Sequence, residues 1–519
     1  MRNQKKSGFR KLSGMNKVSL NADKHEGRFM HRAMKSMPWL IYASAAWLTL
    51  VPCEIAFADD TPSTDNVLRD KDEGEPVEGG RLVIDQSVAD KAVSGRKWYL
   101  TSNWSQAGNA TDGSTTIQSG VTIGNNSNNN QWFVSGSLVS NGTATKSSVT
   151  AINATVYGDI IGGDGHKGAS ENNVEITHTI VSRIIYGGRV QDNVGENDAS
   201  FLNNVSMTAG SSADEVWGGF ALYGNIRNNT VVIDDSKVLS YCGGGYTMYG
   251  IARDNTIELK NISSADTVFG GGSYYQTGDV IHNIVTLGDS NVTKVVHGGI
   301  TYSGKVEYNE VHLKNSSAST IFGGGLQNGD VLNNIVTLED SKANSVYGGY
   351  TPNGNADGNS VTVTGSDSSI SSAVYGGWGT TGASGNKVTL DKVTVSGIVG
   401  GGKTDSGAAS GNEVSLSNGT TFKGALYAGY TENGNATGNE VSLSDVSAPK
   451  DVYASFTKKG QAGGIDDDTR SKVTITESSV TGSVYGGYTK SGAANYSSVT
   501  IIDSTIRDST VNEDSIGSS

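Results

Sequence analysis

The feature of this sequence that most limits its possible folds is a phrase that recurs along the chain. Residues 345–363 read SVYGGYTPNGNADGNSVTV, and residues 483–501 read SVYGGYTKSGAANYSSVTI. An apolar or aromatic residue before a small pair, usually Gly-Gly, recurs at intervals of 24 to 32 residues, at Ile161, Tyr186, Trp217, Cys242, Phe269, His297, Phe322, Tyr347, Tyr375, Val399, Tyr427, Tyr453 and Tyr485. A fixed period of this length indicates a repeat protein.

A second pattern, N-x-V-x-L, accompanies the first in most repeats. It occurs with the asparagines Asn309, Asn334, Asn359, Asn386, Asn412 and Asn439, and Ser497 takes the asparagine position in the last copy. The apolar residues are two apart and the residues between them are polar, which predicts a strand with one buried face. A polar corner such as Asp340-Ser341 follows the strand.

One such repeat cannot bury its apolar face alone, whereas stacked repeats cover one another. We therefore predict an all-β protein, a parallel β-helix or β-solenoid of about 13 coils with repeats of ~27 residues. We expect the glycine pairs to form its sharp corners, because glycine adopts positive φ without steric cost. These pairs include Gly348-Gly349, Gly376-Gly377 and Gly486-Gly487.

The other repeated residues suit roles inside the stack. Tyr347, Tyr375 and Tyr485 should stack between coils, and the asparagines should form a ladder of side-chain amides. A residue that recurs thirteen times is better explained by structure than by catalysis. We thus predict these positions to be structural anchors.

The rest of the chain divides by composition. Residues 1–58 carry ten Lys or Arg, an apolar run at Pro38–Val51 and an A-x-A site ending at Ala58. They predict an extended secretory signal peptide cleaved after Ala58, with an N-terminal anchor as the alternative. We expect an acidic linker at 59–80, an N-terminal cap and irregular first coils at 81–150, the repeat solenoid at 151–505 and a polar tail at 506–519. Trp98, Trp104 and Trp132 should form the core of the cap, with carbohydrate stacking as the alternative.

Charge and cysteine content limit the partners. Beyond residue 58 the chain keeps 29 basic and 49 acidic residues, which argues against nucleic acid as a partner. One cysteine remains, so no internal disulfide can form. We expect Cys242 to be a small buried side chain, with a reactive thiol as the alternative.

Catalytic motifs are scarce. The sequence has no G-x-S-x-G and no C-x-x-C. GGDGHKG at 162–168 begins like a calcium-binding repeat but is not repeated in tandem, and His297 occupies an aromatic anchor position. Asp466, Asp467 and Asp468 beside Arg470 form the densest acidic cluster, which we interpret as a solvated loop, with an ion or ligand site as the alternative. The sequence predicts neither cofactor nor metal, and no enzyme.

The leader and the Gly/Asn/Ser/Val-rich repeats resemble the passenger region of autotransporters, the type V secreted proteins of Gram-negative bacteria. That resemblance implies export to the cell surface, the outer membrane or the medium, and adhesion to host, matrix or bacterial surface ligands. It also implies an outer-membrane barrel, absent from this sequence and therefore expected to be encoded elsewhere if present. Passengers share a fold rather than a site, so no functional residue carries over. A glycan-active β-helix enzyme and a truncated, non-functional passenger remnant are the alternatives.

Overall fold

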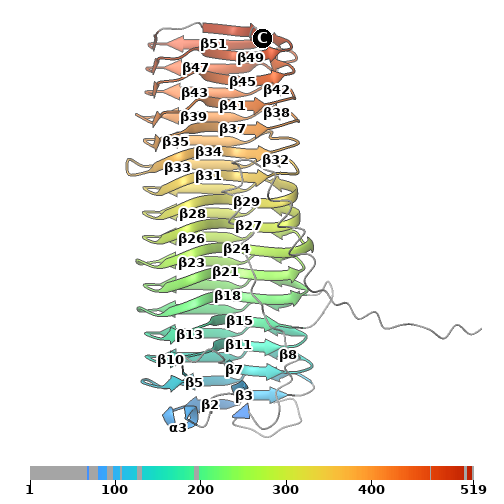
Figure 1. Cartoon of the computed structure of the whole chain (residues 1–519), viewed down its shortest axis with the longest axis vertical. Coiled ribbons are helices and arrows are strands. Elements are labelled where there is room, and N and C mark those ends of the chain that lie inside the picture. Colours follow the sequence, from blue (N-terminus) through green and yellow to red (C-terminus); the bar gives the residue numbers. More distant parts are fainter. Residues whose placement is uncertain are drawn as a thin grey trace, which may run out of the picture. The chain divides into compact units, whose positions relative to one another are not determined.

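Parallel strands stacked coil upon coil build this protein (Figure 1). The computed structural model describes residues 67–68, 80–90, 97–105, 108–125, 131–191, 198–467, 469–507 and 511–516. It is 69% strand and 1% helix and forms a β-solenoid of about 14 turns. The predicted fold class is therefore confirmed. The stack is slightly longer than the Gly-Gly count of 13 because strands of residues 81–150 pair in register with the later coils.

The V-x-L segments form a sheet of sixteen parallel strands, which we call the inner-pattern sheet. In order, these are β2 (Arg81–Ile84), β5 (Ser114–Ile117), β9 (Ser148–Ile152), β13 (Asn173–Thr177), β17 (Asn204–Thr208), β20 (Thr230–Asp234), β23 (Thr256–Lys260), β26 (Ile284–Gly288), β28 (Glu310–Lys314), β30 (Ile335–Glu339), β33 (Ser360–Thr364), β35 (Lys387–Asp391), β39 (Glu413–Ser417), β43 (Glu440–Ser444), β47 (Ser471–Thr476) and β51 (Ser497–Ile502). Alternate residues are buried, as the period of two requires.

The Gly-Gly segments lie in a second parallel sheet, which we call the glycine sheet. Its longer strands are β3 (Lys97–Ser105), β7 (Gln131–Val139), β11 (Asp159–Gly165), β15 (Ile184–Val190), β18 (Ser212–Tyr223), β21 (Lys237–Tyr249), β24 (Ser264–Thr277), β27 (Asn291–Glu307), β29 (Ser317–Leu332), β31 (Lys342–Thr351), β34 (Ser369–Gly379), β37 (Ile398–Thr404), β41 (Leu426–Thr431), β45 (Val452–Lys459) and β49 (Val484–Ser491). Short strands at the corners complete it, and β38 (Ala409–Ser410), β42 (Ala436–Thr437), β46 (Ala462–Gly463) and β50 (Ala494–Asn495) form a third small sheet.

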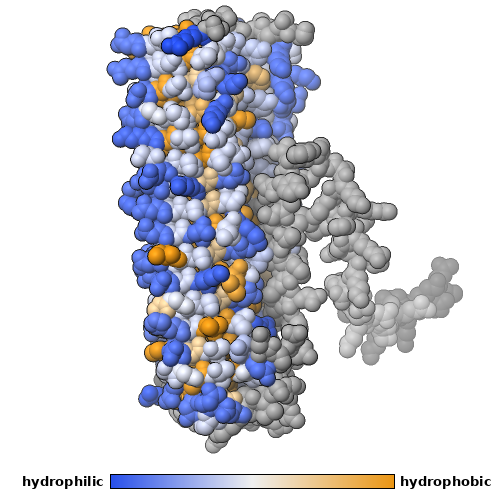
Figure 2. Space-filling view, turned by 60° about the vertical axis from the view of Figure 1, so that its left-hand side comes forward, coloured by the Kyte–Doolittle hydropathy of each residue, from blue (hydrophilic) through white to orange (hydrophobic). Residues whose placement is uncertain are grey.

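Two apolar cores run through the stack. The main core lies between the inner-pattern sheet and the first part of the glycine sheet, and includes Val346, Val361 and Val388. A smaller core of residues such as Val280, Val306 and Val331 lies beyond the glycine pairs. Outward-facing positions are mostly polar, and Figure 2 shows isolated apolar patches among them on one face. Exposed residues such as Ile180 and Ile262 belong to this outer surface.

The glycine pairs do not adopt the left-handed φ that was expected of them. Gly348, Gly349, Gly376 and Gly377 lie within strands β31 and β34, and Gly486 and Gly487 lie within β49; none has a φ in the left-handed region. The prediction that these pairs form corners through positive φ is therefore wrong. Left-handed φ occurs at two other positions in most coils: at the Asp-Ser corner, as in Asp340 (φ 46°), and at the residue before the ladder asparagine, as in Gly358 (φ 67°).

The two ends of the described stack contain regular structure. The short helix α3 (Gln86–Ala89) places Ala89 in the main core, and the side chain of Gln86 bonds to both the N–H and the C=O of Thr122. β1 (Val67–Leu68) lies in the expected acidic linker and pairs with β3. β53 (Val511–Ile516) lies in the expected polar tail and pairs with β49, so both segments contain a strand.

Residues 1–58, including Ala58, lie outside the described residues. Within the described part, no helix is long and apolar enough to cross a membrane.

Candidate functional site

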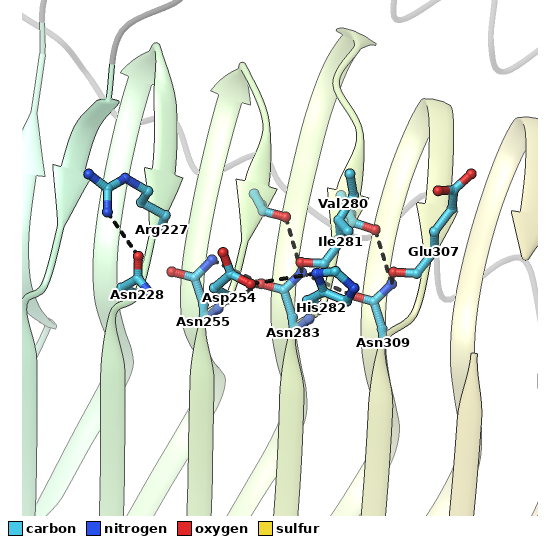
Figure 3. A network of polar contacts seen from close by, with 11 residues as sticks. Arg227, Asn228, Asp254, Asn255, Val280, Ile281, His282, Asn283, Glu307 and Asn309 are labelled. Carbon is cyan, nitrogen blue, oxygen red and sulfur yellow. Dashed lines mark hydrogen bonds and ion pairs between the residues drawn. The ribbon is translucent and has the colours of Figure 1, made fainter. Parts of the chain in front are cut away.

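A ladder of eleven buried asparagines separates the two cores. The side-chain Nδ2 of each of the first ten donates to the Oδ1 of the asparagine in the next coil at 2.8–3.2 Å, and that of the last donates to Ser455. The ladder consists of Asn172, Asn203, Asn229, Asn255, Asn283, Asn309, Asn334, Asn359, Asn386, Asn412 and Asn439. The same Nδ2 groups also donate to main-chain carbonyls, as Asn309 does to Val280 and Glu307 (Figure 3). The ladder thus satisfies buried polar groups of the main chain.

The glycine pairs face this ladder, which explains why they are glycines. A Cβ on Gly349 would lie 2.5 Å from Nδ2 of Asn359, and a Cβ on Gly348 would lie 2.4 Å from the carbonyl oxygen of Gly376. Close approach, rather than a special φ, therefore excludes larger residues here.

At both ends of the ladder, serine replaces the asparagine and a second serine replaces the glycine that faces it. Before the first asparagine, Ser147 occupies the ladder position and faces Ser137, with their hydroxyls 2.6 Å apart. After the last, Ser471 faces Ser455 at 2.7 Å. A glycine and an asparagine are thus replaced by two serines of intermediate size, so the space between the two cores stays filled.

The outward face of the glycine sheet carries two rows of aromatic rings, which we call the aromatic strip. The first row is Tyr186, Trp217, Phe269, His297, Phe322, Tyr347, Tyr375, Tyr427, Tyr453 and Tyr485. The second row is Phe220, Tyr246, Tyr350, Trp378, Tyr430, Phe456 and Tyr488. The two rows lie on either side of the glycine pairs.

Rings of successive coils stack, and rings of one coil touch edge to face. Phe322 lies 4.9 Å from His297 and 5.0 Å from Tyr347, measured between ring centroids. Tyr485 and Tyr488 are three residues apart yet only 5.0 Å apart at 67°. Residues three apart in a straight strand point to opposite faces, so the strand bends at the glycine pair and brings both rows together.

Two predicted anchors belong elsewhere. Cys242 pairs with Val216 and Val268, and Val399 pairs with Val374, so both side chains point into the main core. Their aromatic positions are taken by Gly243 and Gly400. Each of these two coils has three consecutive glycines, so the sequence did not show that the aromatic position lies one residue after Cys242 and Val399. The Cys242 side chain is fully buried and burial raises the pKa of its thiol, which matches the expected apolar role.

Cations of the chain itself occupy two positions of the second row. Lys403 takes the position between Trp378 and Tyr430, and its Nζ lies 3.5 Å from the Trp378 centroid and 5.9 Å from that of Tyr375. Arg189 takes the position before Phe220, and its Cζ lies 5.8 Å from the Tyr186 centroid and 5.4 Å from that of Phe133. Both contacts have the geometry of cation–π interactions.

A charged cluster adjoins the early part of the aromatic strip. Asp159 is buried and accepts from Arg183 at 3.2 Å and from the main-chain N–H of Ile184. Glu215 accepts from Nε1 of Trp217 at 2.9 Å. Burial raises the pKa of Asp159 although Arg183 opposes it, and burial raises the pKa of Glu215 although the Trp217 bond opposes it. Sequence reasoning missed this cluster because its members are separated by a whole coil or more.

The other predicted candidates have local contacts. Asp466 accepts from the N–H and hydroxyl of Thr469, and Asp467 pairs with Arg470; Asp468 lies outside the described residues. In the GGDGHKG segment, Asp164 is paired with Arg189. Among the described residues, no group of three His, Cys, Asp or Glu could hold a metal ion.

Two of the three tryptophans expected in the core of the cap have described side chains, and both are buried. Trp132 lies in the main core and Trp104 is buried, while the side chain of Trp98 lies outside the described residues.

Comparisons with known proteins give no relative. No protein-family model matches the chain, and no curated protein matches it.

Proposed function

We propose that this protein is a surface-exposed, autotransporter-like passenger that acts as a structural and adhesive scaffold. The second row of the aromatic strip carries the proposal, because its half-buried rings repeat one type of surface over several coils instead of gathering groups at one point; most first-row rings are buried. Tyrosine and tryptophan are enriched at protein interfaces, where they combine apolar area with a polar edge. Solenoids use extended surfaces of this kind for binding.

The partial exposure of the second row is consistent with contact to a partner. Tyr350, Trp378, Tyr430 and Tyr488 are half-buried, so their outer edges reach the surface while their bodies are packed. Burial raises the pKa of Tyr350 to about 12, so its phenol is neutral and keeps a hydroxyl donor across the physiological range.

Binding of the purified, fluorescently labelled protein to a panel of host cells, bacteria and immobilised matrix proteins tests the function. We expect binding to at least one surface, reduced about tenfold or more by the combined substitutions Tyr350→Thr, Trp378→Thr and Tyr430→Thr. The matched control carries Thr362→Ala, Thr389→Ala and Ser415→Ala on the outward face of the inner-pattern sheet and should bind normally.

Two outcomes would contradict the proposal. Wild-type protein that binds no surface in the panel would remove adhesion, and a strip variant that binds as well as the control would remove the strip as the binding surface. Circular dichroism on each variant shows whether its fold is retained.

A second candidate, cleavage of a glycan, is favoured by the charged cluster alone. Two carboxyl groups with raised pKa values beside arginines and Trp217 are of the kind used for general acid–base catalysis. Asp159→Asn and Glu215→Gln should each abolish glycan cleavage if this candidate is right. Absence of cleavage by the wild-type protein across a panel of polysaccharides would exclude it.

A further inference from the structure

The aromatic strip already holds two cations, and they lie at equivalent positions. Lys403 and Arg189 both occupy the second row, where other coils have Phe220, Tyr350 or Trp378. Each cation contacts the first-row ring of its own or the adjacent coil, Tyr186 or Tyr375, and a further ring next to it. Arg189 is also held by an ion pair with Asp164, whereas Lys403 has the closer ring contact, 3.5 Å from the Trp378 centroid.

Lys403 shows how a cationic side chain lies against the strip. Its coil lacks the first-row ring, since Gly400 occupies that position, and a Cβ there would lie 2.6 Å from the ring of Tyr375. The ammonium group therefore lies against rings of the preceding coil. Burial lowers the pKa of Lys403, while Asp405 and Glu432 act in the opposite direction.

Carboxylates accompany the rings in several coils. Glu215 accepts from Trp217, Asp451 accepts from Tyr453 at 3.0 Å and Glu432 accepts from Tyr430, in each case with one residue between the partners in sequence. Rings flanked by carboxylates combine a negative π face with negative charge. Beyond residue 58 the chain also has an excess of twenty acidic residues, which attracts cations at longer range.

We propose that the aromatic strip binds a lysine- or arginine-rich segment of a partner protein, whose cationic side chains lie against the rings as Lys403 does. This inference rests on the proposed adhesive function and names the chemistry of its partner. The successive coils place equivalent rings about 5 Å apart, so one segment can engage several coils in turn. Charge complementarity favours such a segment over an acidic peptide or a neutral glycan.

The experiment measures binding of a fluorescent deca-lysine peptide by anisotropy at low and physiological salt. We expect binding that weakens with salt. Lys403→Ala should strengthen it about threefold or more, because the Trp378 ring becomes available to the peptide. Trp378→Leu should weaken it by a similar factor.

Matched controls separate the strip from general charge. Lys387→Ala removes the same charge from the inner-pattern sheet, where Lys387 pairs with Glu413, and should strengthen binding less than Lys403→Ala does. Thr389→Ala is the control for Trp378→Leu. Deca-glutamate and a neutral glucan oligosaccharide are the alternative ligands.

The outcomes distinguish this inference from the proposed function. Equal effects of Lys403→Ala and Lys387→Ala, no binding of deca-lysine, or stronger binding of the glucan would each overturn the cationic partner. If the protein still bound cells through the strip in any of these cases, the adhesive function would stand. If it bound neither peptide nor cells, both would fail.

Discussion

At the scale of the residue, the narrow region between the two cores is filled by complementary pairs. Most coils pair a glycine with an asparagine, as in Gly349 and Asn359, and the flanking coils pair two serines, as in Ser455 and Ser471. In an early coil the two residues are exchanged. Asn103 occupies the glycine position, in register with Ser137, and Gly113 occupies the ladder position, just before Ser114, which pairs with Ser148. The summed volume is preserved although the individual residues are not.

This complementarity predicts a non-additive double-mutant cycle. Gly349→Ser should destabilise the protein because its Cβ overlaps the Asn359 amide, and Asn359→Ser should destabilise it by removing a rung and leaving polar groups unsatisfied. Each should cost about 1–3 kcal/mol in the free energy of unfolding. The double variant reproduces the pair Ser455 and Ser471, and should recover at least about 1 kcal/mol of the summed loss. Chemical denaturation of all four proteins measures this coupling, and additive losses would contradict it.

His297 provides a pH-dependent prediction. Burial between Phe269 and Phe322 lowers the pKa of His297 to about 3 from 6.5. The unfolded chain therefore takes up a proton at this residue below about pH 6.5, whereas the folded chain does not until about pH 3, so acid removes stability across that interval. His297→Phe should make the melting temperature fall less between pH 7 and pH 4. The melting temperatures are measured by circular dichroism. An equal fall in both proteins would contradict a contribution of His297 to the loss of stability in acid.

At the scale of the element, most coils combine an inner-pattern strand and a long strand of the glycine sheet with two left-handed corners. The corner residues vary in type, with Asp340, Asn333 and Gly358 all at positive φ. The serine of the Asp-Ser corner contributes a second ladder. Ser341 donates to the carbonyl of Glu339 and accepts from the N–H of Ser316. The corner thus depends on a short polar side chain followed by a hydroxyl, and tolerates several residues at the turn itself.

The direction of the inner-pattern strands is tested by neighbouring substitutions in β35. Val388 is fully buried between Val361 and Val414, so Val388→Asp places an unpaired charge in the main core and should cost about 3–5 kcal/mol. Thr389 faces outward, and Thr389→Asp should cost less than about 1 kcal/mol. Thermal unfolding of both variants measures the contrast, and similar melting temperatures would contradict the assigned faces.

At the scale of the whole molecule, the described chain is a stack in which each coil contacts its neighbours. Strand pairings run between successive coils in register through nearly all of the inner-pattern sheet, and stability should therefore be close to a sum over coils and their interfaces.

Removal of one complete coil should leave the architecture intact. Deletion of residues 359–385 joins Gly358 to Asn386 and keeps Val388 in the register that Val361 held. We expect a folded β protein by circular dichroism with a modestly lower melting temperature. Deletion of residues 359–371 removes part of a coil and should abolish cooperative unfolding. Loss of folding in the complete-coil variant would contradict the additive view.

The repeat predicted the coils and the alternation of faces because both follow from a period visible in one dimension. It did not predict the role of the glycines, since a left-handed corner and a close approach both favour glycine, and only the facing Asn359 distinguishes them. It also misplaced Cys242 and Val399 by one residue, because three glycines leave the register ambiguous. The charged cluster of Asp159 and Glu215 was invisible, since it arises from packing between coils.

The asparagine ladder has a direction that the strands alone do not provide. Every side-chain N–H points toward the later coil and every Oδ1 toward the earlier one, so eleven amide dipoles align head to tail along the stack. Aligned amides add their dipoles, as peptide groups do in a helix, and bonds in such a chain polarise one another. At the early end Ser147 donates to the ladder, and at the late end Ser455 and Ser471 accept from it. The two ends of this column are therefore opposite electrical poles, with the positive pole at the late end, and a coil fitted to one pole would not fit the other.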